Sequence, residues 1–172
     1  MMNYGCEGLN VVISGGTSGI GLATAEKFLR DGANVYILGR SVLRGALAVQ
    51  KLLAKTERTA VYIPCDVTSV EECRKAVASI GGAIHILVNA AGVYMEQRLE
   101  NVTEADIANI FDTNVKGAML LTQASLPFMY GGGSIVNVAS DAGISGNYGC
   151  PVYCASKGAI VALTKALALD YA

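Results

Sequence analysis

The chain alternates short apolar, β-branched segments with longer segments that have helical periodicity. The apolar segments predict strands at residues 9–14, 34–38, 59–64, 84–90 and 134–140. The segments between and after them predict helices at 19–31, 41–55, from 69 onward, at 103–129 and at 153–171. Such alternation is typical of an α/β fold, in which a doubly wound parallel sheet carries helices on both faces.

Polar residues at the predicted boundaries support this division. Gly32 is placed to end the first helix. Ser69 with Glu72, and Thr103 with Asp106, each have the spacing of a capping box, in which two side chains satisfy free backbone N–H groups at a helix start. We therefore expect one helix to begin after each of these pairs.

Length and composition are those of a single globular domain. A chain of 172 residues can bury one substantial core, so we expect one domain over residues 1–172. The mean hydropathy is +0.43, yet no apolar run approaches the roughly 18–20 residues needed to cross a bilayer. Buried parallel strands would account for the apolar excess, and we expect no membrane span.

Charge and cysteine usage narrow the classes of function. A net charge of −1 gives no basic surface for nucleic acid or an anionic membrane. Five cysteines without a C-x-x-C pair predict neither a disulfide framework nor a zinc site, and no metal is expected. Reduced thiols and a start without signal-peptide features point to the cytoplasm.

A glycine-rich turn follows the first predicted strand and opens the first helix. Its glycines, Gly15, Gly19 and Gly21, would allow a tight turn and the approach of a diphosphate to backbone N–H groups at the helix N-terminus. The spacing is not G-x-G-x-x-G, and no G-x-x-x-x-G-K-[ST] motif occurs. The turn therefore indicates a dinucleotide site rather than a P-loop.

Taken with later motifs, the turn resembles that of the short-chain dehydrogenase/reductase family, and the resemblance covers essentially all 172 residues. The family's T-G-x-x-x-G-x-G matches Ser14 to Gly21, and its N-N-A-G matches residues 89–92, with Ala90 in place of the second Asn. The remaining motifs, in chain order, match Asp66 in CDVT, Asn114 in DTNVKG, Ser140 in NVASDAG, and Tyr153 with Lys157 in YCASK. Each motif alone is weak, but six in order at the expected strand ends are strong.

The resemblance implies a catalytic set of Asn114, Ser140, Tyr153 and Lys157. Tyr153 would be the general acid/base, Ser140 would bind the reacting oxygen, and Asn114 would hold a water that leads to Lys157. Tyr153 and Lys157 are four residues apart, so on a helix they share a face, and an ammonium nearby favours the phenolate. His85 is the only histidine and no G-x-S-x-G occurs, so a serine-hydrolase triad has little support.

The implied cofactor is NADP(H) in preference to NAD(H). NAD-preferring relatives tend to carry Asp where Gly39 stands, whereas here Arg40 follows and could pair with a 2′-phosphate. The glycine turn itself offers no second basic residue, since Ser18 occupies that place. The expected dinucleotide contacts are Gly15, Thr17, Ser18, Gly19, Ile20, Gly21, Arg40, Ser41, Asp66, Val67, Asn89, Ala91, Gly92, Tyr153 and Lys157.

The expected activity is reversible oxidoreduction between an alcohol and a ketone of small size. A 3-oxoacyl reductase and a sugar or hydroxysteroid dehydrogenase both remain open, as does a non-catalytic dinucleotide-binding or regulatory protein. Family members usually continue beyond residue 172 with further strands and a substrate loop, so segment 134–140 would form an apolar sheet edge. The resemblance and the apolar last helix also predict a homodimer or homotetramer.

Overall fold

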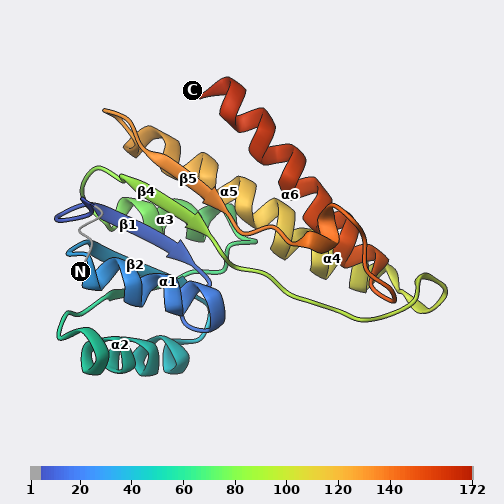
Figure 1. The fold of residues 1–172 in the computed structure, drawn as a ribbon, viewed down its shortest axis with the longest axis horizontal. Coiled ribbons are helices and arrows are strands. Elements are labelled where there is room, and N and C mark those ends of the chain that lie inside the picture. The colour runs from blue at the N-terminus through green and yellow to red at the C-terminus, as the bar shows by residue number, and fades with distance from the viewer. Residues whose placement is uncertain (1–4, 172) are drawn as a thin grey trace.

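The computed structural model describes residues 5–171, and these form a parallel sheet with helices on both faces (Figure 1). The strands are β1 (Asn10–Ser14), β2 (Asn34–Gly39), β3 (Val61–Pro64), β4 (Ile86–Asn89) and β5 (Ser134–Asn137), in the spatial order β3-β2-β1-β4-β5. The helices are α1 (Gly19–Arg30), α2 (Val42–Thr56), α3 (Val70–Ala78), α4 (Glu104–Phe111), α5 (Gly117–Ser125) and α6 (Pro151–Asp170). The doubly wound α/β prediction is confirmed.

Each face of the sheet has its own apolar core. On one face, α1 and α2 bury Leu29 and Leu52 against Val11 and Ile37. On the other face, α3 and α5 pack against β1, β4 and the end of β2, with Leu121 fully buried. Because both faces are covered, the central strands are apolar at nearly every position, which explains the unbroken apolar runs in the sequence.

Between α4 and α5 the chain changes helical pitch without leaving the helix. Residues Asp112–Lys116 form a π-helical turn, and short 3₁₀ turns occur at Leu99–Asn101, Leu126–Phe128 and Asp141–Gly143. The continuous helical region predicted over 103–129 is thus present but carries a π-turn. Such turns often lie at functional sites, because the extra residue re-aims the side chains around it.

The two predicted capping boxes turn out differently. At α4 the Thr103 hydroxyl accepts from the Asp106 N–H, and the Asp106 carboxylate accepts from the Thr103 N–H, so the box is complete. At α3 the Ser69 hydroxyl accepts from the Glu72 N–H, but the Glu72 carboxylate accepts from the N–H of Asp66 at 2.8 Å. The prediction of a capping box at Ser69 and Glu72 is therefore only half correct, since the Glu72 carboxylate does not accept from the Ser69 N–H. The turn that begins at Asp66 brings the Asp66 N–H within reach of Glu72 instead.

Helix α6 runs along the β5 edge of the sheet, and its C-terminal end projects beyond the other elements (Figure 1). The helix has 20 residues with a mean hydropathy of 1.4, long and apolar enough to cross a membrane by length and composition, and 22% of its apolar stretch is buried. The sequence prediction concerned unbroken apolar runs, and α6 is interrupted by Lys157 and Lys165, so length and composition alone leave the prediction of no membrane span untested. An open cavity of about 440 Å³ lies between α6, β5 and the segment before β5, and its lining includes Ile135, Thr164 and Tyr171.

Candidate active site

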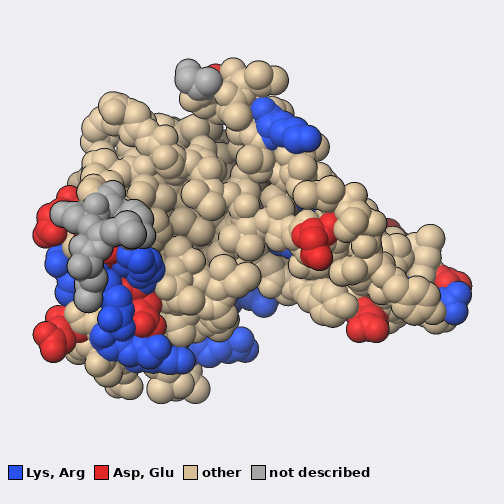
Figure 2. All heavy atoms as spheres, in the orientation of Figure 1, with Lys and Arg blue, Asp and Glu red and all other residues tan. Residues whose placement is uncertain are grey.

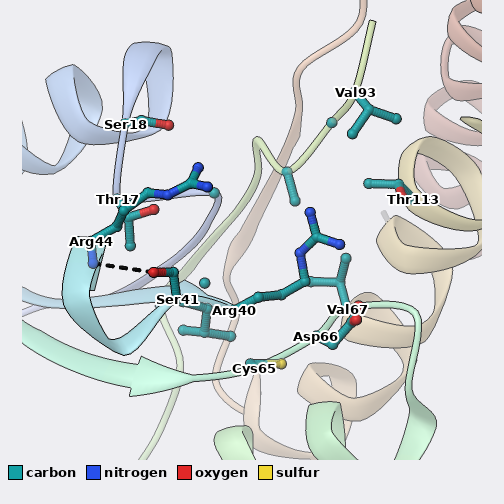
Figure 3. Close-up of a pocket in the computed structure, with 15 residues that line it drawn as sticks. Thr17, Ser18, Arg40, Ser41, Arg44, Cys65, Asp66, Val67, Val93 and Thr113 are labelled. Atoms are coloured by element: carbon teal, nitrogen blue, oxygen red, sulfur yellow. Dashed lines mark hydrogen bonds between the residues drawn. The ribbon is translucent and has the colours of Figure 1, made fainter. Parts of the chain in front are cut away.

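A cavity of about 170 Å³ opens at the carboxyl ends of the strands, where the strand order reverses beside β1 (Figure 3). In doubly wound sheets this switch point leaves a crevice, because the crossovers on its two sides lead to opposite faces. Segments after all of the first four strands reach it. The lining residues are Gly15, Thr17, Ser18, Leu38, Gly39, Arg40, Ser41, Arg44, Cys65, Asp66, Val67, Ala91, Gly92, Val93 and Thr113.

The glycine-rich turn forms one wall of this cavity, and its geometry requires glycine. Gly15 has φ +66°, and a Cβ placed there would lie 2.8 Å from the Ala90 carbonyl oxygen. A Cβ on Gly21 would lie 2.5 Å from the Gly15 carbonyl oxygen. The turn is therefore packed tightly against both the β4 end and the start of α1.

The first backbone N–H groups of α1 donate no hydrogen bond to the side chain of the N-cap residue of the helix. Ser18 is the N-cap residue, it is exposed, and its hydroxyl makes no capping hydrogen bond. Because the first turn of a helix carries free N–H groups and partial positive charge, it is suited to an anion such as a phosphate. These residues fit the diphosphate of a dinucleotide.

Serine in place of the family's threonine ties the ends of β1 and β4 together. The Ser14 hydroxyl, which is buried, accepts from the N–H groups of Ala90 and Ala91, each at 3.1 Å. These contacts hold the segment after β4 against the glycine turn. The serine hydroxyl thereby positions Ala91 and Gly92 on the cavity wall.

Two guanidinium groups point into the cavity from the end of β2 and the first turn of α2 (Figure 3). Arg40 follows β2 directly, and Arg44 lies one turn into α2, where its N–H donates to the N-cap hydroxyl of Ser41 at 3.3 Å. Within residues 5–171 neither arginine forms an ion pair. The cavity lining therefore contains two arginines without an ion pair, where sequence reasoning identified only one.

Asp66 and Gly39 lie on the side of the cavity formed by β2 and β3. The Asp66 carboxylate accepts from the N–H and the hydroxyl of Thr68, at 3.0 and 2.9 Å, so its orientation is set by the following turn. A Cβ on Gly39 would lie 2.9 Å from Thr17 Cγ2, so Gly39 and the glycine-rich turn are in close contact.

Next to this cavity the structure brings Asn114 and Lys157 together. A Cβ on Gly92 would lie 3.3 Å from Asn114 Oδ1 and 3.7 Å from Lys157 Nζ, so both side chains converge on one point of the wall. Lys157 is buried, its Nζ donates to the Val138 carbonyl at 2.7 Å, and burial lowers the pKa of its ammonium. Because an ammonium group has three N–H donors, Lys157 can also bind hydroxyl groups or water beside this cavity.

The Asn114 amide is fixed by its own contacts. Its Oδ1 accepts from the Val93 N–H at 2.8 Å, and its Nδ2 donates to the Val93 carbonyl at 3.0 Å and to the Ser156 hydroxyl at 3.1 Å. Asn114 lies in the π-helical turn, which aims it at the segment after β4. The residue thus joins the π-turn, the β4 end and α6.

Tyr153 occupies the first turn of α6, one turn before Lys157. The Lys157 ammonium lies 5.8 Å from the centre of the Tyr153 ring. The Tyr94 ring packs edge-on against the Tyr153 ring, with the two ring centroids 4.9 Å apart. Gly143 lets this part of α6 approach closely, since a Cβ there would lie 2.5 Å from the Lys157 carbonyl carbon. The tyrosine and lysine therefore share a face, as their spacing predicted.

Ser140 follows β5, but its hydroxyl is directed to its own turn. It donates to the Asp141 carboxylate at 2.9 Å and accepts from the Ala142 N–H at 3.2 Å. These contacts cap the 3₁₀ turn Asp141–Gly143. To bind a reacting oxygen, the hydroxyl would have to exchange its partner at Asp141.

Nine of the expected dinucleotide contacts line the cavity, and others do not. Gly19, Ile20 and Gly21 lie outside the lining, and the buried Asn89 side chain donates to Thr122 and Asn137 beneath it. Sequence reasoning missed Arg44, Leu38, Cys65, Val93 and Thr113, and it used Gly39 only as the place of an absent acid. Arg44 could have been predicted once Ser41 was taken as the N-cap of α2. A residue three positions after the N-cap still lies in the first turn of the helix, and that turn borders the cavity.

The remaining residues considered in the sequence analysis are candidate metal ligands, the single histidine and the cysteines. Among residues 5–171 no group of three or more His, Cys, Asp or Glu side chains could hold a metal ion. His85 Nδ1 accepts from the Asn10 N–H at 3.0 Å and joins β4 to β1. The five cysteines are free thiols.

Comparison with known proteins places this geometry among oxidoreductases. The family model described as short chain dehydrogenase matches residues 9–172. An uncharacterised oxidoreductase of Thermotoga maritima is 38% identical over 173 residues, covering 99% of this chain and 68% of that protein. The meso-2,3-butanediol dehydrogenase of Serratia marcescens is 35% identical, covering 94% of this chain and 64% of that protein.

Solved structures agree on the fold. The L-sorbose reductase of Gluconobacter frateurii, in complex with NADPH and L-sorbose, superposes with a TM-score of 0.91 at 30% identity. The match covers 98% of this chain and 66% of the reductase. The chain thus spans about two thirds of the length of the relatives it matches.

Proposed function

The chain belongs to the short-chain dehydrogenase/reductase family, and from that premise we propose that it transfers a hydride between NADP(H) and a small alcohol or ketone. The observation that carries the proposal is the convergence of Asn114, Lys157 and Gly92 beside a cavity with two unpaired arginines. A relative named as a butanediol dehydrogenase and a structure solved with NADPH and a sugar agree with a hydroxyl-bearing substrate.

For the cofactor, we assign the diphosphate to the glycine turn and the first turn of α1. Thr17 and Ser18 line the cavity at this point, and Ser41 with Arg40 faces the ribose end. Asp66 and Val67 would contact the adenine, and Ala91 and Gly92 the inner ribose. The bound nicotinamide would supply the hydride, and the protein would supply position and electrostatic stabilisation.

For the chemistry, we assign proton transfer to the Tyr153 hydroxyl. Lys157 has one Nζ hydrogen bond to the Val138 carbonyl, so its remaining donors can hold ribose hydroxyls and a water. Both Nδ2 hydrogens of Asn114 are engaged, so a water held by this residue would donate to Oδ1 or to its backbone carbonyl. Ser140 would bind the reacting oxygen after turning from Asp141.

A turnover assay tests the proposal against the alternative of a non-catalytic dinucleotide-binding protein. The chain is incubated with NADPH or NADH and a panel of small ketones, 3-oxoacyl thioesters, ketoses and oxosteroids. Oxidation of the cofactor with one substrate class supports an enzyme and names the class. Tight cofactor binding without turnover across the panel would instead favour the binding protein.

We predict that NADPH binds more tightly than NADH, by roughly 10–100-fold, because a charge-assisted hydrogen bond contributes about 1.5–3 kcal/mol. Arg40→Asp should narrow or reverse this preference, since a carboxylate accepts from the 2′-hydroxyl and repels a 2′-phosphate. Titration of both cofactors by fluorescence gives the two dissociation constants. Arg74→Asp, a change of the same charge on α3 away from the cavity, should leave the ratio unaltered. Equal constants in the unmutated protein would refute the assignment.

We also predict a homodimer or homotetramer in the cytoplasm. The face formed by β5 and α6 carries few charged side chains, while most charges gather near α1 and α2 (Figure 2). Ile107 on α4 and Met119 on α5 are exposed as well. Covering such apolar area with a second copy lowers its free energy in water. Light scattering at micromolar concentration should give a multiple of the 17.8 kDa chain, and a monomer would contradict the prediction.

A further inference from the structure

Two thiols lie together at the start of α6, on either side of Tyr153 in the sequence. Cys150 is the N-cap residue of the helix and Cys154 lies in its first turn. Their sulfur atoms are 3.7 Å apart. Cys150 is buried, whereas Cys154 is half-buried, so a small oxidant has access to one of the two sulfurs.

The same thiols hold the preceding loop. Both can donate to the Asn147 carbonyl oxygen, at 3.7 Å for Cys150 and 3.8 Å for Cys154, and the Asn147 N–H donates to the Cys154 sulfur at 3.2 Å. The rest of this loop is open to solvent, with Ile144 80% and Tyr148 87% exposed. The contacts with sulfur are therefore the ones that attach its middle to α6.

We propose that Cys150 and Cys154 form a reversible disulfide and that this bond slows the reaction at Tyr153. Cys150 is the N-cap residue, and its sulfur lies 3.7 Å from that of Cys154, whereas a disulfide bond is about 2.05 Å long. Closing the bond therefore pulls Cys150 and the first turn of α6, which carries Tyr153, towards each other. A strained disulfide is also more easily reduced, as a reversible switch requires.

The oxidant can be hydrogen peroxide. The Cys154 thiolate attacks one peroxide oxygen, the O–O bond breaks, and the products are a sulfenic acid and hydroxide. The Cys150 sulfur then attacks the Cys154 sulfur and displaces hydroxide, which leaves as water with the thiol proton. Two thiols lose two hydrogens and two electrons, and one peroxide becomes two waters. Cys154 reacts first because its sulfur is the more exposed of the two.

Oxidation also removes both S–H donors, so the contacts to the Asn147 carbonyl are lost. We expect the loop at 144–149 to loosen as the first turn of α6 distorts. The effect on rate rests on the proposed function, but the disulfide itself and the loosened loop do not. This separation allows the two to be tested independently.

The test treats the reduced 172-residue protein with hydrogen peroxide, then measures intact mass, the cross-linked peptide, amide hydrogen exchange and turnover. We expect a mass lower by two hydrogens, a Cys150–Cys154 peptide, faster exchange at residues 144–149, and a roughly tenfold or greater loss of turnover, since a 1 Å misplacement can cost on the order of 100-fold. Dithiothreitol should restore all four readings. Cys150→Ser and Cys154→Ser should each abolish the cross-link and the reversible loss, while Cys6→Ser should behave like the unmutated protein.

The outcomes discriminate between the parts of the proposal. A cross-link mapped to Cys65 and Cys73, or no cross-link at all, overturns it. A Cys150–Cys154 bond with unchanged turnover overturns the effect on Tyr153. If the reduced protein turns over no carbonyl substrate, the proposed function fails, and the cross-link with its change in hydrogen exchange still decides whether the thiol switch exists.

Discussion

Tyr153→Phe is expected to lower turnover by about 10²–10⁴-fold, as is typical when a general acid/base is lost. The phenylalanine ring keeps the edge-on packing on Tyr94, so α6 and the cavity should be preserved. Dissociation constants for NADP(H) should therefore change little. Stopped-flow measurement of the chemical step with the best substrate found, together with cofactor titration, gives both quantities.

Lys157→Ala is the informative comparison, because it should impair both binding and turnover. Its ammonium lies beside Tyr153 and also reaches the wall at Gly92. Tyr130→Phe, on an exposed turn before β5, is the matched control and should have no effect. Near-normal turnover of Tyr153→Phe would show that the assigned proton donor is wrong, and the glycine turn would then support only dinucleotide binding.

Gly15→Ala is expected to destabilise the protein by about 2–6 kcal/mol and to abolish dinucleotide binding. A positive φ costs a non-glycine residue about 1–3 kcal/mol, and forcing a methyl group into a packed site costs about 1–3 kcal/mol more. The methyl group would lie 2.8 Å from the Ala90 carbonyl oxygen and 2.9 Å from Ala91 Cα, both of them backbone atoms. Relief requires the turn or the β4 end to move, and residues of both segments line the cavity. Urea unfolding and cofactor titration measure the two losses.

Gly81→Ala separates the two causes. Gly81 has φ +71°, close to that of Gly15, but a Cβ there meets nothing within 4 Å. It lies between α3 and β4, outside the cavity lining. We expect a loss of only about 1–3 kcal/mol, from the strained backbone alone, with cofactor binding intact. If Gly15→Ala cost no more than Gly81→Ala and still bound cofactor, the close approach at the turn would not matter.

The sequence by itself determined the elements and their order, because each strand and helix follows from local periodicity and polar boundaries. The five apolar segments became β1 to β5, and Thr103 with Asp106 did open α4. Motif order also indicated which strand ends carry chemistry, since carboxyl ends of parallel strands meet at one edge of the sheet. Tyr153 and Lys157 could be paired in advance because helical spacing fixes a shared face.

The tertiary structure decided what depends on atoms from distant segments. Glu72 binds the Asp66 N–H instead of completing a capping box, and Arg44 reaches the cavity although it lies within a helix. Both Nδ2 hydrogens of Asn114 are engaged by Val93 and Ser156, contacts that no linear pattern encodes. The approach of the Cys150 and Cys154 sulfurs likewise depends on the fold of the loop before α6, because Asn147 holds both. Side-chain partners are chosen in three dimensions by packing and hydrogen bonding, whereas periodicity records only which residues are buried.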